Sequence, residues 1–193
     1  MSSHHFVKED QEPALIIMNA AAITFGKVQE LLEWSPTVIV SEEALSMVLG
    51  WGIKIDVILC KEANLNSFKV SLVEQTPLRF ISFQHNSDAL SSAIHFLVTA
   101  NYKAVNILVN DLVQLEWMQS LEGIDVEVFC DHQRWTYSKS GIFEKWLSAG
   151  MQLFTYPVAN VEVVNLNSQL KCMRDGMVRI ERLQPLWVGE ELA

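Results

Sequence analysis

The first two thirds of the chain alternate between short apolar runs and segments whose apolar residues repeat at helical spacing. Short continuous apolar runs are typical of buried parallel strands, and strands that alternate with helices predict βα units. The expected strands are Ala14–Met18, Thr37–Val40, Ile53–Cys60, Leu78–Phe83 and Val105–Val109. We therefore expect an α/β layer of about five strands, mostly parallel and Rossmann-like, with helices on both faces of the sheet.

The starts of two helices are well marked. Ser41 is a good N-cap, and Glu42 and Glu43 after it suit the positive end of a helix dipole. Asn86-Ser87-Asp88 precedes the helix with the clearest pattern. Its apolar positions follow the spacing of one helical face: Leu90, Ala93, Ile94, Leu97 and Ala100.

The pattern changes near Gly123, after which apolar and polar residues alternate with period two between frequent turns. This alternation predicts an antiparallel sheet or β-sandwich. Ile142–Leu147 fits a strand or a helix equally well. We expect a flexible arm over residues 1–13, an α/β nucleotide-binding-like domain over 14–122 and a β-sandwich domain over 123–193. The boundary lacks a Pro/Gly-rich linker, which favours tight packing between the two domains.

Composition narrows the class of protein. Half of the 193 residues are hydrophobic, so the chain can bury a real core. A net charge of −9 disfavours nucleic acid, whose phosphates need clustered basic residues. No apolar stretch reaches the ~20 residues that span a bilayer, and the start lacks a signal-peptide core. Three well-separated cysteines indicate reduced thiols and a cytoplasmic protein.

Candidate ligand-binding residues follow the predicted strands, because ligands of open parallel sheets sit beyond the carboxyl ends of the strands. The acidic residues expected there are Glu42, Glu43, Glu62, Asp88 and Asp111. Such an edge could hold a divalent cation. Helix capping explains several of the same carboxylates without any ligand, and none of them stand at a recognisable metal spacing. Both interpretations stay open.

Two further residues at this edge have alternative roles. Lys61 directly follows a buried strand, where it could meet a phosphate, replace the charge of a cation or lie on the surface as an ordinary lysine. His85 could act as an acid or base, although a lone histidine is more often structural or exposed. The absence of glycine from Ile53 to Glu122 removes the residue that lets backbone N–H groups approach phosphates closely.

Several segments resemble the thiamin pyrophosphokinase family. Ala44–Leu59, ALSMVLGWGIKIDVIL, is similar to the family's apolar helix followed by "GI-x-PD-hydrophobic-I". Asn101–Leu108 is similar to a later strand of the family, and VEVFCDHQRWTY to the pair that opens its β-sandwich. The resemblance implies the reaction ATP + thiamin to AMP + thiamin diphosphate, with Mg and ATP as cofactors. It also implies a homodimer with the ligand site near the subunit boundary.

The departures from the family's pattern fall on its chemistry. Cys60-Lys61-Glu62-Ala63-Asn64 stands where the family has the metal loop "GDFDS", so both aspartates are replaced. Asn110-Asp111-Leu112 replaces the loop "GGR-x-DH". From the strand ends and the resemblance together, we expect a catalytic role for Asp88 and Lys61, and metal binding by Glu62 and Asp88 or by no residue. We also expect cofactor binding by Glu42, Glu43, Asn86, Ser87 and Asp111, with a protein that uses no cofactor as the alternative.

Three hypotheses remain. The first is a relative of thiamin pyrophosphokinase with weak or lost catalysis that still binds a small molecule, either thiamin or a nucleotide. The second is an active enzyme whose magnesium ligands have moved to Glu42, Glu62 and Asp88. The third is a structural or regulatory homodimer, whose interface or core would contain Trp117, Trp135, Trp146 and Trp187.

Overall fold

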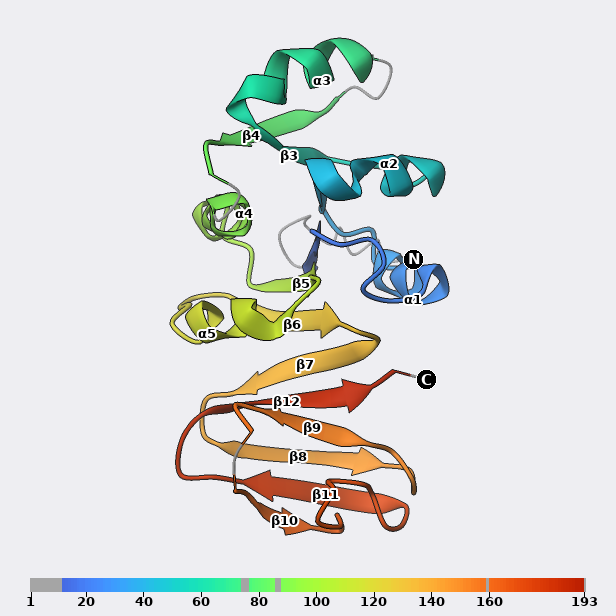
Figure 1. Cartoon of the computed structure of the whole chain (residues 1–193), viewed down its shortest axis with the longest axis vertical. Coiled ribbons are helices and arrows are strands. Elements are labelled where there is room, and N and C mark those ends of the chain that lie inside the picture. Colours follow the sequence, from blue (N-terminus) through green and yellow to red (C-terminus); the bar gives the residue numbers. More distant parts are fainter. Residues whose placement is uncertain (1–11, 74–76, 86–87, 159, 193) are drawn as a thin grey trace, which may run out of the picture.

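The computed structural model describes residues 12–73, 77–85, 88–158 and 160–192 (Figure 1). The arm expected over residues 1–13 therefore falls almost entirely outside the described residues. Within them, a long sheet of nine strands runs through the molecule and a second sheet of three strands covers part of it. No helix of the described part is long and apolar enough to cross a membrane.

Six parallel strands form the first part of the main sheet, in the order β4-β3-β2-β1-β5-β6. They are β1 (Ala14–Ile17), β2 (Val38–Ser41), β3 (Val57–Lys61), β4 (Arg79–Phe83), β5 (Ala104–Leu108) and β6 (Asp125–Cys130). The strand order reverses at β1, which pairs with β2 on one side and β5 on the other. That reversal is the switch point at which open α/β sheets bind ligands.

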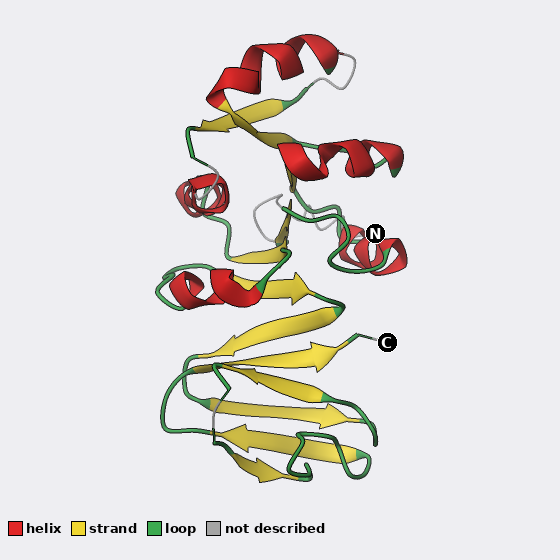
Figure 2. Ribbon diagram, in the orientation of Figure 1, coloured by secondary structure: helices red, strands yellow, loops and turns green. Residues whose placement is uncertain are grey.

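Helices cover both faces of the parallel strands (Figures 1 and 2). They are α1 (Phe25–Leu32), α2 (Glu42–Gly50), α3 (Leu65–Ser71), α4 (Ala89–Thr99) and α5 (Leu115–Met118), with short 3-10 turns η1 (Glu62–Asn64) and η4 (Leu112–Gln114). Alternate residues of β1 enter opposite cores. Ile16 packs in the cluster that includes α4 and α5, and Leu15 in the cluster that includes α1 and α2.

The helix predictions hold best where capping and periodicity agree. The Ser41 hydroxyl accepts a hydrogen bond from the Ala44 N–H and caps α2, as predicted. Four of the five apolar positions expected in α4 are buried, but Ala100 is exposed beyond the end of the helix. Asp88 is the N-cap of α4, although its side chain makes no capping hydrogen bond. Asn86 and Ser87 lie outside the described residues.

The third strand is shorter than predicted, because it begins at Val57 and not at Ile53. The carboxylate of Asp56 accepts a hydrogen bond from the Val38 N–H at 3.0 Å. A side chain, and not a backbone carbonyl, therefore pairs with this N–H of β2 just before β3 begins.

The main sheet continues from the parallel strands into antiparallel ones. Beyond β6 it adds β7 (Gln133–Ser138), β12 (Leu186–Glu191) and β9 (Leu153–Tyr156), each antiparallel to its neighbour. The expectation that everything after Gly123 is antiparallel is wrong for β6, which pairs in parallel with β5. Alternation of apolar and polar residues with period two indicates that one face of a strand is buried. It does not indicate whether the neighbouring strand runs parallel or antiparallel.

The second sheet has the order β10-β11-β8 and is antiparallel. Its strands are β10 (Glu162–Val164), β11 (Gly176–Glu181) and β8 (Ile142–Leu147), which settles the latter segment as a strand. Val178 and Ile180 of this sheet pack in one buried cluster with Leu186 and Val188 of the main sheet. The two sheets therefore share a core in the C-terminal third of the chain.

Candidate functional site: a cavity at the switch point of the sheet

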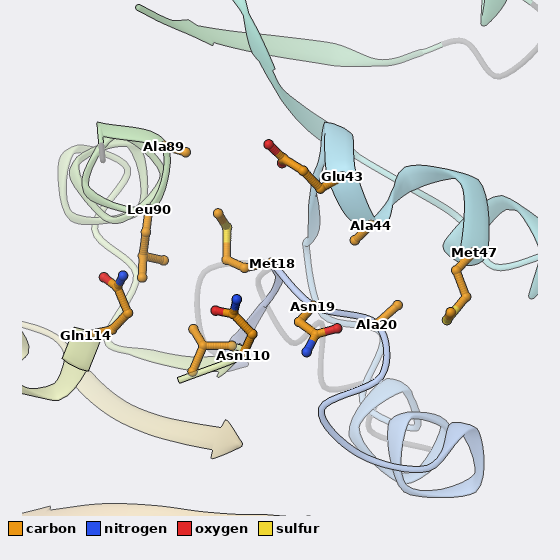
Figure 3. Close-up of a pocket in the computed structure, with 11 residues that line it drawn as sticks. Met18, Asn19, Ala20, Glu43, Ala44, Met47, Ala89, Leu90, Asn110 and Gln114 are labelled. Atoms are coloured by element: carbon orange, nitrogen blue, oxygen red, sulfur yellow. The ribbon is translucent and has the colours of Figure 1, made fainter. Parts of the chain in front are cut away.

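A cavity of about 560 Å³ lies at the carboxyl ends of β1 and β5, where the strand order reverses. We call it the switch-point cavity. Residues after these strands and from the first turns of α2 and α4 surround it (Figure 3). The lining residues are Met18, Asn19, Ala20, Glu43, Ala44, Met47, Ala89, Leu90, Val109, Asn110 and Gln114. Its volume lies within the usual range of small-molecule sites.

Backbone and side-chain hydrogen bonds fix the loop that follows β1. The Ser41 hydroxyl donates to the Met18 carbonyl at 3.2 Å, which joins the end of β2 to this loop. The N–H groups of Met18 and Asn19 both donate to the Leu108 carbonyl of β5. The Asn19 carboxamide oxygen accepts from the Ala21 N–H at 3.0 Å. The wall of the cavity is therefore held by both strands that flank the switch point.

The lining combines one carboxylate, three carboxamides and apolar side chains. Glu43 extends from α2 toward the start of α4 (Figure 3). The carboxamides are those of Asn19, Asn110 and Gln114, and the apolar part includes Met18, Met47 and Leu90. Such a surface can bind a small molecule that has an apolar body and a few hydrogen-bonding groups.

The loop expected to bind metal contains an internal ion pair. One oxygen of the Glu42 carboxylate accepts hydrogen bonds from the Lys61 N–H and from the Asn64 side-chain amide, both at 3.1 Å. The other oxygen lies 3.9 Å from the Lys61 ammonium. The Glu42 side chain is only 9% exposed, whereas that of Lys61 is 43% exposed. This geometry is compatible with two of the alternatives for Lys61, a positive charge that replaces a cation and a half-exposed surface lysine.

The other predicted acidic residues have separate surroundings. Glu62 accepts a hydrogen bond from the Gln84 amide at 3.5 Å. Asp111 accepts from the Val113 N–H at 3.1 Å and so caps the turn η4. Asp88 precedes α4, and its N–H donates to the carbonyl of the exposed His85.

The donor set does not fit a magnesium site. Among residues 12–73, 77–85, 88–158 and 160–192, no group of three or more His, Cys, Asp or Glu side chains is placed to hold a metal ion. Glu42 is already paired with Lys61 and with two N–H donors, and magnesium sites need carboxylates that are free to coordinate. Metal binding by Glu62 and Asp88 therefore stays a prediction that the observed contacts do not support.

Sequence reasoning pointed to the edge of the sheet at which the cavity lies, but it missed most of the lining residues. Of the five acidic candidates, Glu43 alone lines the switch-point cavity among the described residues. Met18, Met47, Leu90 and Gln114 were missed, because apolar and amide residues carry no recognisable chemical pattern. The signal that would find them is the reversal of strand order at β1, which depends on topology.

Two buried thiols lie at the ends of β3 and β6. Burial raises the pKa of the Cys60 thiol, and the negative charge of Glu42 raises it further. Burial, followed by the charges of Asp131 and Asp111, raises the pKa of the Cys130 thiol to about 12. All three cysteines are buried and free. Neither of these two thiols is an activated nucleophile, since reactivity needs the thiolate.

No protein-family model matches the sequence, and no curated protein matches it in sequence. Among solved structures, the chain is similar to the thiamin pyrophosphokinase from Candida albicans, with a TM-score of 0.67 at 10% identity over 97% of this chain and 91% of that one. The thiamine pyrophosphokinase from Bacillus subtilis gives a TM-score of 0.63 at 10% identity, over 94% of this chain and 99% of that one. The thiamin pyrophosphokinase from Geobacillus thermodenitrificans gives a TM-score of 0.65 at 10% identity, over 93% of this chain and 97% of that one.

These matches extend over nearly the full length of both chains, so they include the parallel strands and the antiparallel region together. Sequence identity near 10% means that the likeness concerns the fold alone. The resemblance seen in the sequence is confirmed at that level: the chain has the fold of the thiamin pyrophosphokinases and is strongly divergent in sequence.

Proposed function

We propose that this protein is a thiamin pyrophosphokinase-like binding protein that takes a small molecule in the switch-point cavity and has weak or lost pyrophosphoryl transfer. The observation that carries the proposal is the contact between Glu42 and Lys61. Transfer of a pyrophosphoryl group depends on positioning and on neutralisation of charge by metal ions. An ammonium group 3.9 Å from the Glu42 carboxylate opposes the binding of a further cation there.

The reaction of the family would use Mg and ATP, and this proposal keeps only the binding function. The cavity volume and the fixed loop after β1 support it. The candidate ligands are thiamin and a nucleotide.

We regard the parallel part as Rossmann-like and the two packed sheets as a β-sandwich. We place the protein in the cytoplasm, because three free cysteines suit a reducing compartment.

Calorimetric titration of the full chain with thiamin, and separately with ATP in the presence and absence of magnesium, tests this proposal. We expect any binding that occurs to be independent of magnesium. A marked gain in ATP affinity on addition of magnesium would favour the alternative, an active enzyme with relocated ligands.

A structural or regulatory homodimer is the second candidate function, and one exposed apolar surface favours it. Trp146 and Met177 are cross-strand partners on the outer face of the second sheet and are 58% and 57% exposed. Trp135 and Trp187, by contrast, are buried in the core. We propose that Trp146 and Met177 contact a second copy. The variant Trp146→Lys should then shift the mass in solution from dimer to monomer, and a wild type that is already monomeric at micromolar concentration would contradict this.

A further inference from the structure

The charge of the switch-point cavity determines which class of ligand it suits. Among the described lining residues, Glu43 is the only one with an ionisable side chain. The remaining polar groups are neutral carboxamides, and no lysine or arginine belongs to this set. Phosphate groups are usually held by basic side chains or by free backbone N–H groups. The lining therefore presents a negative charge where a nucleotide would need positive ones.

The helix ends at the cavity do not compensate for this. The start of α2 would attract an anion through its dipole, equivalent to about half a positive charge. That start already carries the carboxylates of Glu42, which is paired with Lys61, and of Glu43, and the Ser41 hydroxyl takes the Ala44 N–H. The full charge of Glu43 exceeds the partial charge of the helix end. An anion at this position would be repelled, and a cation would be attracted.

We infer that the switch-point cavity selects a compact organic cation that carries N–H donors, a protonated amine or an amidinium on an apolar body. This inference rests on the small-molecule binding proposed above. An N–H-bearing cation can donate a charge-assisted hydrogen bond to Glu43. Its body would lie against Met18, Met47 and Leu90, whose flexible or branched side chains adapt to irregular shapes.

The lining also favours cations that carry N–H groups over quaternary ammonium ligands. Recognition of a quaternary ammonium uses aromatic faces, because such a cation has no N–H to donate. None of the eleven described lining residues is aromatic. The carboxamides of Asn19, Asn110 and Gln114 instead offer oxygen acceptors and N–H donors around the same space (Figure 3). A carboxylate with amides therefore favours a hydrogen-bonding cation.

Four matched probes and ATP test the inference on the full chain: benzamidine, benzyltrimethylammonium, benzamide and benzoate. Methyl NMR of a ¹³C-methyl-methionine sample reports where each probe binds. Met18 and Met47 line the cavity, whereas Met173 and Met177 are exposed in and next to β11 and act as internal controls. We expect benzamidine to shift the first two methyl signals and leave the other two unchanged. Benzamide, benzoate, benzyltrimethylammonium and ATP should bind at least about tenfold more weakly.

The variant Glu43→Gln keeps the size and hydrogen-bonding ability of the side chain and removes its charge. It should weaken benzamidine binding about tenfold or more, a difference of about 1.4 kcal/mol. Glu162→Gln removes a carboxylate from β10, outside the cavity lining, and should leave the affinity unchanged. Because Glu43 is exposed, the Gln variant should fold normally.

The outcomes separate the inference from the proposed function. If benzoate or ATP shifts the Met18 and Met47 signals more readily than benzamidine, the cation class is wrong while the cavity remains a binding site. Equal binding of benzamide or benzyltrimethylammonium, or an unchanged affinity in Glu43→Gln, also overturns it. If no probe shifts these signals at millimolar concentrations, the inference and the proposed binding function both fall.

Discussion

At the scale of single residues, the central feature is the ion pair between Glu42 and Lys61 at the rim of the sheet. Glu42 is nearly buried and accepts hydrogen bonds from the Lys61 N–H and the Asn64 amide. A buried carboxylate is stable only when its charge and its lone pairs are satisfied. Lys61 provides the charge, so the loop can form without a bound metal. We therefore expect the pair to have a structural role that an ordinary surface lysine would not have.

The Lys61→Met variant tests this role. It keeps an unbranched apolar stem of similar size and removes the ammonium, so Glu42 would lose its charge partner. We expect the free energy of unfolding to fall by about 1 kcal/mol, measured by urea denaturation. Lys54→Met is the matched control, because Lys54 pairs with Asp56 but is 77% exposed, and its effect should stay within about 0.5 kcal/mol. Equal effects of both variants would show that Lys61 is an ordinary surface residue.

The Cys130 thiol gives a prediction about pH. Its pKa is raised from 9.0 to about 12 in the folded protein, so the folded state keeps the proton while the unfolded state loses it. Stability is therefore fully present below about pH 9 and falls as pH rises toward 12, by at most about 1.4 kcal/mol per unit. The Cys130→Ala variant should lose less stability than the wild type between about pH 8 and pH 11. Parallel pH profiles of urea midpoints would contradict this.

The residues of the candidate site illustrate what sequence alone can predict. Glu43 was found because carboxylates after a parallel strand are visible in the sequence. Leu90 was predicted as a core residue and also lines the cavity. Whether Glu42 would bind a metal or pair with Lys61 could not be decided, since the answer depends on distances between residues nineteen positions apart.

At the scale of elements, β6 joins the two halves of the chain. It pairs in parallel with β5 on one side and antiparallel with β7 on the other. Helix and strand positions followed from periodicity and capping, as in α2 and α4. The parallel pairing of β6 with β5 could not be predicted in this way. The residues of a strand indicate which of its faces are buried, and they do not specify which strands lie beside it.

Close packing in the antiparallel part depends on one glycine of β12. Gly189 lies between Trp135 of β7 and Phe154 of β9 in the register of the sheet. A Cβ atom at Gly189 would lie 2.8 Å from the Trp135 ring, which is 3% exposed and cannot move outward freely. The absence of a side chain at this position therefore makes room for the indole.

Gly189→Ala should lower the free energy of unfolding by about 1–3 kcal/mol, the usual range for overpacking a core. Gly50→Ala is the control, because a Cβ at Gly50 would meet no atom within 4 Å. As the last residue of α2, it should be neutral or stabilising by up to about 1 kcal/mol. A Gly189→Ala variant as stable as the wild type in urea would show that Trp135 can shift at low cost.

At the scale of the whole molecule, the fold is shared with known enzymes although the sequence is not. The chain keeps the fold of the thiamin pyrophosphokinases over more than nine tenths of its length at about 10% identity. Core residues define that fold through burial and pattern, whereas catalysis depends on a few side chains at the rim of the sheet. At that rim Lys61 pairs with Glu42, and Glu43 faces the switch-point cavity.

The most direct test of this account is an assay for thiamin diphosphate with the purified full chain, thiamin and saturating magnesium and ATP. We predict turnover far below about 1 s⁻¹, or no product above the rate without protein, because the Glu42–Lys61 pair opposes magnesium binding at this rim. Turnover at about 1 s⁻¹ or faster, within the ordinary range of enzymes, would contradict the account.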